Sequence, residues 1–378
     1  MLIVTPPSMK NEVIWSDVYP QEHLLERISL LELRLIQVSD RLNQALELIL
    51  RQSRTMQSEH LLIETLLEAL TSSGVIEGDK VSGLWKEKKQ QEEKQEALSE
   101  RRTIALKQIL ASTTSTKFDS FTNLVKEGFR LIAQGEEKQG VRTLERAAAI
   151  ESANFPLLTF IGEYYFSSDK QTLARDYLER AYKSAPGEFK NALLLGIVLA
   201  DNGEIGAAQK LLESFAAQSS FAISFALGLT YAAEKRFPET LAAFKRALAA
   251  RPCAETHYLV GSAYSELKRQ QMAVRHLQKA VEINKNFADA WFTLGAVFLR
   301  EGNEKSAKEA LSMALAARDT NAQSHAILRN PQKYAEITAT TLLFARLSHL
   351  KRNLITGAPP RLVKILREEI EEISLKKE

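Results

Sequence analysis

The sequence predicts an all-α protein whose central part is a stacked array of helical hairpins, and two observations support this prediction. First, a glycine recurs at intervals of 34, 34, 32, 33 and 34 residues, at Gly128, Gly162, Gly196, Gly228, Gly261 and Gly295. Second, each of these glycines lies within a similar order of small and large residues. A period in this range is typical of arrays in which each unit packs on the next.

The last repeat shows this order most clearly. Its residues are Trp291, Leu294, Gly295 and Phe298, then Gly302 in a turn, then Ala307, Leu311 and Ala314. Antiparallel helices approach closely only where side chains are small, and larger side chains fill the gaps on either side. The glycine of the first helix and the alanines of the second are therefore the expected points of close approach.

The other repeats keep this order with a few departures. His257 replaces the first aromatic residue of the fifth repeat, and Thr240 replaces an alanine in the fourth. In the third repeat, Phe215 stands at the second small position, where we expect a local distortion. The first repeat departs most, because Gly140 lies inside its second helix at a cost of about 1 kcal/mol relative to alanine.

On these residues, the chain resembles the tetratricopeptide-repeat family, with six repeats over residues 121–321. The resemblance implies a right-handed superhelical solenoid of helical hairpins. It also implies that the first helices of the repeats line a concave groove, and that this groove binds peptides or helices of other proteins.

In this family the second, fifth, ninth and twelfth residues of each first helix face the groove. That register assigns mostly apolar residues to it: Val125, Phe129, Ile132, Thr159, Glu163, Phe166, Leu193, Ile197, Phe225, Leu229, Tyr258, Ser262, Phe292 and Leu299. An apolar groove suits the apolar face of an amphipathic helix. Exposed apolar patches of several hundred Å² are uncommon, so we expect either another protein or a terminal helix of this chain to cover it.

A different kind of helix is predicted before the array. After a flexible N-terminus over residues 1–20, residues 21–57 have apolar residues at alternating spacings of four and three: Leu24, Ile28, Leu31, Leu35, Val38, Leu42, Ala45 and Ile49. This spacing is the seam of a left-handed coiled coil. Two interpretations stay open, namely a parallel homodimer, in which Arg27 and Glu32 would pair between chains, and a helix folded back on its own chain.

Residues 58–115 predict a helical connector to the array. It contains a helix over about 59–70, a turn at Ser72–Gly74, and a helix of mixed charge from Trp85 to Ile109 that we expect to be solvated. The run of serine and threonine over 112–116 reads as a linker.

Residues 322–378 predict the helices that close the array. Asn330–Pro331 interrupts any seventh repeat, and a capping helix is expected over about 334–354. A last helix carries Leu362, Ile365, Ile370 and Ile373 on one side and glutamates 368, 369, 371 and 372 largely on the other. Three roles are open for it: to lie in the groove as an internal ligand, to bind another protein, or to pack on the cap.

The sequence shows no pattern typical of a catalytic, cofactor or metal site. It has no phosphate-binding glycine loop, no nucleophile elbow and no zinc-binding His-Glu-x-x-His helix. Cys253 is the only cysteine, which excludes an internal disulfide, and His257 and His276 have no evident acidic partner. We therefore expect no enzymatic activity, no cofactor and no bound metal.

Composition points to a soluble helical protein, with 45% apolar and 26% charged residues and a formal net charge of +3. No run of 18 apolar residues predicts a membrane span, and the first residues lack the pattern of a secretion signal. The single cysteine favours a reducing, cytoplasmic location.

These observations favour a noncatalytic scaffold or adaptor that binds a peptide or an amphipathic helix of another protein in the groove. The alternatives are a regulatory subunit of an enzyme, an autoinhibited assembly factor, and an RNA-binding helical array. The near-neutral repeats and the apolar groove argue against the RNA-binding array, which would need a basic groove with polar residues that read bases.

Overall fold

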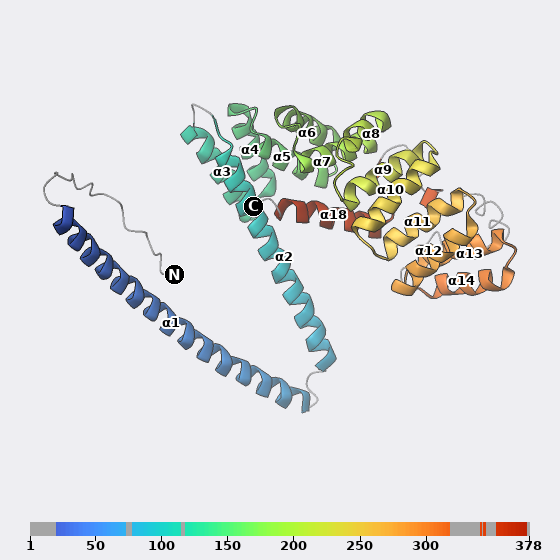
Figure 1. Cartoon of the computed structure of the whole chain (residues 1–378). Helices are drawn as coiled ribbons and strands as arrows, with labels where there is room; N and C mark the ends of the chain where they lie inside the picture. Colours follow the sequence, from blue (N-terminus) through green and yellow to red (C-terminus); the bar gives the residue numbers. More distant parts are fainter. Residues whose placement is uncertain are drawn as a thin grey trace. The chain divides into compact units, whose positions relative to one another are not determined.

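The computed structural model describes residues 20–72, 78–114, 118–317, 341, 343–344 and 353–375. Within these ranges the regular structure is α-helical and no strand is formed, which confirms the predicted all-α class (Figure 1). The chain divides into two units between residues 94 and 95, inside helix α2 (Gly78–Ala111). The expected flexible N-terminus and most of the expected 334–354 helix lie outside the described residues.

The first unit contains α1 (Pro20–Ser72), a single helix of 53 residues. The sequence boundary that we expected at residue 57 falls inside this helix. The physical reason is that no glycine or proline occurs between residues 21 and 73, so nothing interrupts the helical hydrogen bonds there. The described seam residues are exposed within the chain, with Leu35 at 72% and Val38 at 62%.

The second unit contains six helical hairpins that follow one another along the chain (Figure 1). The hairpins are α3 (Phe118–Ala133) with α4 (Glu137–Ile150), α5 (Phe155–Ser167) with α6 (Gln171–Ser184), α7 (Phe189–Asp201) with α8 (Ile205–Glu213), α9 (Phe221–Ala233) with α10 (Phe237–Ala250), α11 (Ala254–Glu266) with α12 (Gln270–Ile283), and α13 (Ala288–Arg300) with α14 (Glu304–Ala316). Apolar residues from successive hairpins form one continuous core.

The repeated glycine is the point of close approach between the two helices of each hairpin. A Cβ added to any of the six glycines would lie less than 3.0 Å from a large side chain sixteen residues later. That side chain is leucine in five repeats, whereas in the fourth an added Cβ on Gly228 would lie 2.2 Å from Phe244 Cε1. The spacing of glycine and large residue therefore sets how closely the two helices pack.

The turn inside each hairpin also has a fixed position. The residue seven positions after each repeat glycine has a positive φ angle, between 57° and 88°. Three of these residues are Gly135, Gly203 and Gly302, and the other three are Asp169, Lys235 and Lys268. Because a side chain disfavours this left-handed conformation, the turns at Asp169, Lys235 and Lys268 hold local strain.

The third hairpin carries the distortion expected from Phe215. Its second helix, α8, has nine residues, whereas the second helices of the other hairpins have thirteen or fourteen. Phe215 follows the end of α8 and packs edge-on against Phe189, with ring centroids 6.1 Å apart. A large residue at a position meant for a small one thus ends the helix early.

Candidate functional site

The residues predicted to line the groove lie on the first helices of the six hairpins and are mostly covered. Those that are buried are Val125, Phe129, Ile132, Leu193, Ile197, Phe225, Leu229, Tyr258 and Phe292. Phe166 and Leu299 are half-buried. These side chains are therefore not an open apolar surface in this structure.

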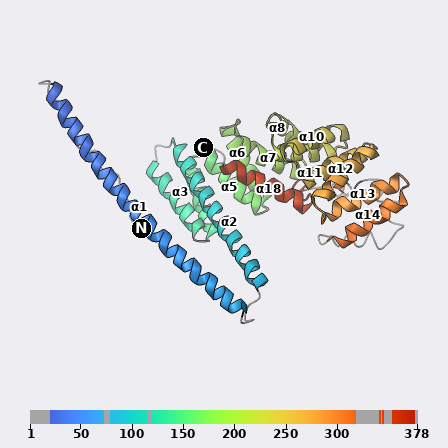
Figure 2. The same ribbon diagram turned by 60° about the horizontal axis from the view of Figure 1, so that its bottom comes forward.

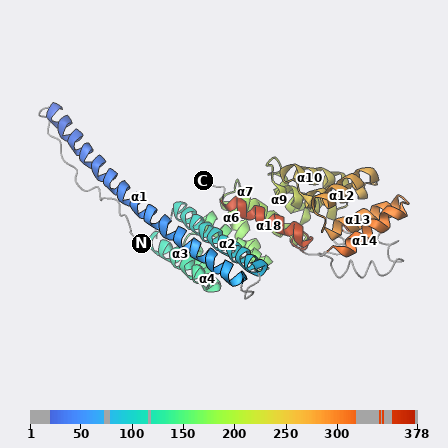
Figure 3. The same ribbon diagram turned by 90° about the horizontal axis from the view of Figure 1, so that it is seen from below.

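The C-terminal helix α18 (Pro360–Leu375) lies along the first helices of the array. It contacts α7 and α9, and Figures 2 and 3 both show it beside α7. Five of its apolar side chains are buried and belong to the same core as most of the groove residues: Leu362, Val363, Ile365, Leu366 and Ile370. An amphipathic helix of the chain itself thus covers part of the predicted groove.

A carboxylate of α18 caps the N-terminus of α9. Glu369 Oε1 accepts a hydrogen bond from Ser220 Oγ at 2.6 Å, and Glu369 Oε2 accepts one from the backbone N–H of Ala222 at 3.1 Å. The first N–H groups of a helix have no partner within the helix, and its dipole attracts negative charge at this end. Glu369 supplies both the acceptor atoms and the charge.

Two ion pairs flank this cap. Arg251 Nη2 lies 3.0 Å from Glu368 Oε2, and Arg361 Nη1 lies 3.6 Å from Glu255 Oε1. The Arg361 guanidinium also lies over the Phe287 ring, 5.3 Å from its centroid. The polar contacts of α18 therefore reach the repeats that contain α9 to α13.

The segment just before α18 is held by one buried aspartate at the end of α7. Asp201 accepts hydrogen bonds from the Ile355 N–H at 2.6 Å and from Thr356 Oγ1 at 2.7 Å. Its backbone carbonyl accepts a third from the Asn353 N–H at 2.9 Å. Burial raises the pKa of the Asp201 carboxyl above its ordinary value, although the hydrogen bonds from Thr356 and Ile355 oppose this shift.

Comparison with known families agrees with this arrangement of hairpins. Models of the tetratricopeptide repeat match residues 193–255 and residues 254–287, which include most of α7 and all of α8 to α12. The chain is a tetratricopeptide-repeat protein. No curated protein matches it.

Several solved structures resemble parts of the tetratricopeptide array. A structure of MamA is 20% identical, with 45% of this chain and 94% of that chain covered and a TM-score of 0.41. YrrB, described as a TPR protein with an unusual peptide-binding site, is 14% identical, with 50% and 98% covered and a TM-score of 0.43. The Cut9–Hcn1 hetero-tetramer is 17% identical, with 62% and 48% covered and a TM-score of 0.44. Likeness at this level says nothing about what this chain binds.

The C-terminal part of α2 packs against the first tetratricopeptide repeats. Ile109 is fully buried, and its carbonyl accepts a hydrogen bond from Asn154 Nδ2 at 3.0 Å. The N–H of Thr114 donates to Glu151 Oε1 at 2.7 Å. The expectation of a solvated helix thus holds for residues 82–100 but is wrong for the last turns, where apolar residues meet the array.

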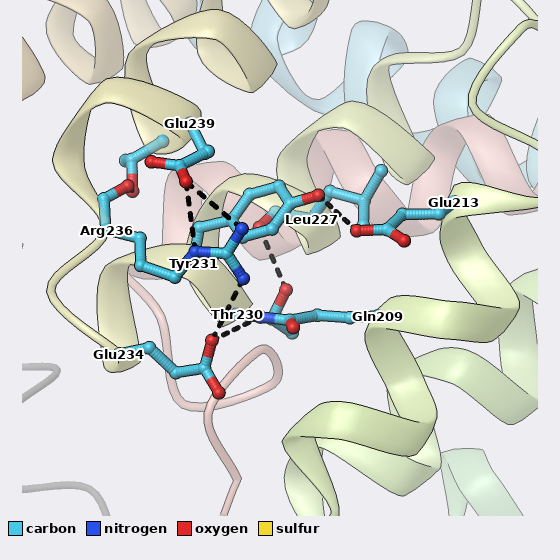
Figure 4. Close-up of polar contacts among 9 residues, drawn as sticks. Gln209, Glu213, Leu227, Thr230, Tyr231, Glu234, Arg236 and Glu239 are labelled. Atoms are coloured by element: carbon cyan, nitrogen blue, oxygen red, sulfur yellow. Dashed lines mark hydrogen bonds and ion pairs between the residues drawn. The ribbon is translucent and has the colours of Figure 1, made fainter.

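Neighbouring repeats are also joined by hydrogen bonds between a tyrosine and a glutamate of the preceding repeat. In both pairs the tyrosine lies three residues after the glycine of its repeat, and the glutamate lies seventeen residues after the glycine of its own. Tyr231 Oη donates to Glu213 Oε1 of the preceding repeat at 2.5 Å, as Figure 4 shows, and Tyr165 Oη donates to Glu145 at 2.7 Å. Arg236 lies over the Tyr231 ring, 4.7 Å from its centroid. Burial, followed by the bond to Glu213, raises the pKa of Tyr231 to about 12.

The described residues hold no group of three or more histidine, cysteine or acidic side chains able to bind a metal. His257 and His276 are brought together, with their Nδ1 atoms 3.1 Å apart, and burial lowers the pKa of both. Among the helices that the structure describes, none is both long and apolar enough to cross a membrane. The tetratricopeptide repeats indicate a protein-interaction scaffold.

Proposed function

We propose that this chain is a protein-interaction scaffold whose concave groove binds an amphipathic helix with an acidic face, and that α18 occupies this groove until a partner helix replaces it. The observation that carries the proposal is the position of α18 along the first helices, with its apolar side buried and Glu369 capping α9. Helix-in-groove binding of this kind depends on apolar residues repeated at helical spacing.

The chemistry of α18 indicates the chemistry of the partner. Its buried residues Leu362, Leu366 and Ile370 recur every four residues, which places them on one side of the helix. Its carboxylates meet a helix N-terminus and Arg251. A competing helix therefore needs the same apolar spacing and a carboxylate one residue before its last buried apolar position.

Tethering gives α18 an advantage over any free helix. A segment that is joined to its binding site by a short linker has an effective concentration of roughly millimolar at that site. A free helix that makes the same contacts must compete against this concentration, so it binds the intact chain weakly. Partner binding is strong only when the partner makes additional contacts or when α18 is released.

A peptide exchange experiment tests the proposal. The chain is ended after Thr356, which keeps the contacts of Asp201, and the labelled peptide of residues 357–378 is titrated into it and into the full chain. We expect at least tenfold tighter binding to the shortened chain, measured by fluorescence anisotropy. The control peptide carries Leu366→Glu, which places a charge on the apolar side. Equal binding to both chains, or equal binding of the control peptide, would contradict the proposal.

α1 supports a second element of the same function, which is self-association into a coiled coil. The seam of alternating four and three spacings continues past residue 49 along the whole helix: Gln52, Met56, Glu59, Ile63, Leu66 and Leu70. Four of these six positions are apolar, and the described seam side chains are exposed within one chain apart from half-buried Leu70. A second copy of α1 is the partner that supplies the matching seam, and it would present two grooves for avid binding.

Light scattering tests this element. We expect a dimeric mass for the full chain and a monomeric mass for Leu35→Pro, because proline interrupts the helix in the middle of the seam. Gln52→Leu replaces a polar seam position with an apolar one and should raise the dissociation temperature of the dimer. A monomeric mass for the unmodified chain at micromolar concentration would refute self-association. The single cysteine, Cys253, makes the cytoplasm the location we propose for this scaffold.

A further inference from the structure

Two histidines of the fifth repeat meet between its two helices. His257 lies in the first turn of α11, and His276 lies in the middle of α12. Their Nδ1 atoms are 3.1 Å apart and their ring centroids 5.4 Å apart. Both side chains are half-buried, and neither belongs to the predicted lining of the groove. The pair is therefore a feature of the array that helix binding in the groove does not use.

The outer nitrogen of each ring is available to a further partner. Neither Nε2 atom makes a hydrogen bond to a residue that the structure describes, and neither is among the fully buried polar atoms. In the neutral pair, one ring donates its Nδ1–H to Nδ1 of the other, so only the second ring carries a hydrogen on Nε2. A proton added to the pair goes to the remaining Nε2. The singly protonated pair thus offers two N–H donors to an anion.

Three cations surround this pair, and none of them has a carboxylate partner among the described residues. Lys245 belongs to α10, and Arg275 and Lys279 belong to α12; all three are exposed. Lys245 Nζ lies 5.2 Å from the centroid of the Tyr264 ring. That ring stacks on His276, with centroids 5.6 Å apart. The cations and the histidines therefore form one continuous cluster.

The charge of these cations acts on the histidines. Burial, followed by the charges of His257, Lys245 and Arg275, lowers the pKa of His276. Burial, followed by the charge of Lys279, lowers the pKa of His257. Positive charge is thus in excess around the pair. An anion bound here would offset this repulsion.

The spacing of the cations favours an extended acidic peptide. Arg275 and Lys279 are one turn apart, which is about 6 Å along α12, and Lys245 belongs to the preceding repeat. Side chains on one side of an extended peptide recur roughly every 7 Å, so several carboxylates can meet several cations. A single-stranded nucleic acid also needs exposed aromatic rings on which its bases stack. The Tyr264 ring of this cluster is buried, at 4% exposed.

We propose that the surface formed by Lys245, His257, Arg275, His276 and Lys279 binds an acidic segment of a partner protein, and that the histidine pair takes up a proton on binding. Carboxylates near the Nε2 atoms stabilise the imidazolium form and raise the pKa of the pair. Affinity should therefore increase as pH falls from about 7.5 to about 5.5, where glutamate, with an ordinary pKa near ~4.3, stays charged. The three cations lie on second helices, so this surface is separate from the groove of the proposed function.

The test uses the full chain and a labelled hexaglutamate peptide, with hexaglutamine as the uncharged control. Fluorescence anisotropy at low salt measures the dissociation constants, because salt screens exposed charges. We expect hexaglutamate to bind, to bind at least threefold more tightly at the lower pH, and to bind far more tightly than hexaglutamine. Equal binding of the two peptides would overturn the proposal.

A matched pair of double variants locates the surface. Arg275→Gln with Lys279→Gln should weaken hexaglutamate binding about threefold to tenfold, since one exposed ion pair is worth at most about fivefold in affinity. Lys305→Gln with Lys308→Gln is the control, because it removes the same charge from exposed positions on α14, the second helix of the sixth repeat. Equal weakening by the two double variants would overturn the assignment of the surface.

Replacing both histidines tests the proton uptake. His257→Gln with His276→Gln should remove the gain in affinity at the lower pH and leave the affinity at the higher pH within about twofold. An unchanged gain would overturn the role of the pair. Equally tight binding of an oligothymidylate of the same charge would overturn the choice of an acidic peptide. None of these results bears on the proposed function, because the substitutions leave the contacts of α18 with Ser220 and Arg251 in place.

Discussion

Replacing Glu369 with alanine is expected to release α18 from the array while the hairpins stay folded. The substitution removes the acceptor of Ser220 Oγ at 2.6 Å and of the Ala222 N–H at 3.1 Å. It also removes the negative charge at the N-terminus of α9. Ser220 keeps its own hydrogen bond to the Ile223 N–H, so α9 retains a cap of its own.

The size of the effect follows from these contacts. A hydrogen bond to a charged group contributes about 1.5–3 kcal/mol, and an interaction with a helix dipole about 0.3–1 kcal/mol. Glu369 is half-buried, and water replaces part of what is lost. We therefore expect a loss of about 2 kcal/mol, which corresponds to a roughly thirtyfold increase in the fraction of chains with α18 undocked.

Hydrogen exchange measures this fraction directly. The backbone amides of residues 361–375 should exchange about thirtyfold faster in Glu369→Ala, whereas those of α10 to α12 should not change. Glu372→Ala is the matched control, because Glu372 is 51% exposed at the side chain and lies 4.0 Å from Arg251. An exposed ion pair contributes about 0–1 kcal/mol. If both variants accelerated exchange in α18 equally, the cap on α9 would not be what holds the helix.

Three further predictions concern the array and its pH dependence. Gly228→Ala should lower the free energy of unfolding by about 1–3 kcal/mol despite the better helix propensity of alanine, since the new Cβ meets Phe244; an unchanged melting temperature would show that the helices can separate at no cost. Lys268→Gly should stabilise the chain by roughly 1 kcal/mol in denaturant unfolding, because φ at this turn is 60°; destabilisation would mean that this turn holds no strain. The pKa of Asp201 is raised by burial, so its protonated form favours the docked 353–356 segment, and its contribution should increase as pH falls through the raised pKa and be complete below the ordinary value of 3.8. Asp201→Asn should remove this pH dependence from the exchange rates of the 353–356 amides, and an unchanged dependence would assign it to other groups.

The hairpins could be predicted from the sequence because their contacts are local. Each repeat glycine meets a large residue sixteen positions later in the same hairpin, so the spacing itself encodes the packing. The turns follow the same rule, with a positive φ seven residues after each glycine. The length of α1 could also have been predicted, because the absence of glycine and proline up to residue 73 leaves no reason for a break at 57.

The contacts of the candidate sites could not be predicted in this way. Glu369 meets Ser220 across 149 residues, and Asp201 meets Ile355 across 154. Nothing near either residue in the sequence distinguishes it from other acidic residues on an amphipathic helix or at a helix end.

The sequence by itself determined the repeat, its register and the apolar character of the groove, since helix pairing within a hairpin depends on residues close together in the chain. Only the tertiary structure decided that the chain's own C-terminal helix covers part of this groove. This outcome depends on contacts between segments more than a hundred residues apart. Such contacts are selected by complementary shape and charge in three dimensions and leave no periodic pattern in the sequence.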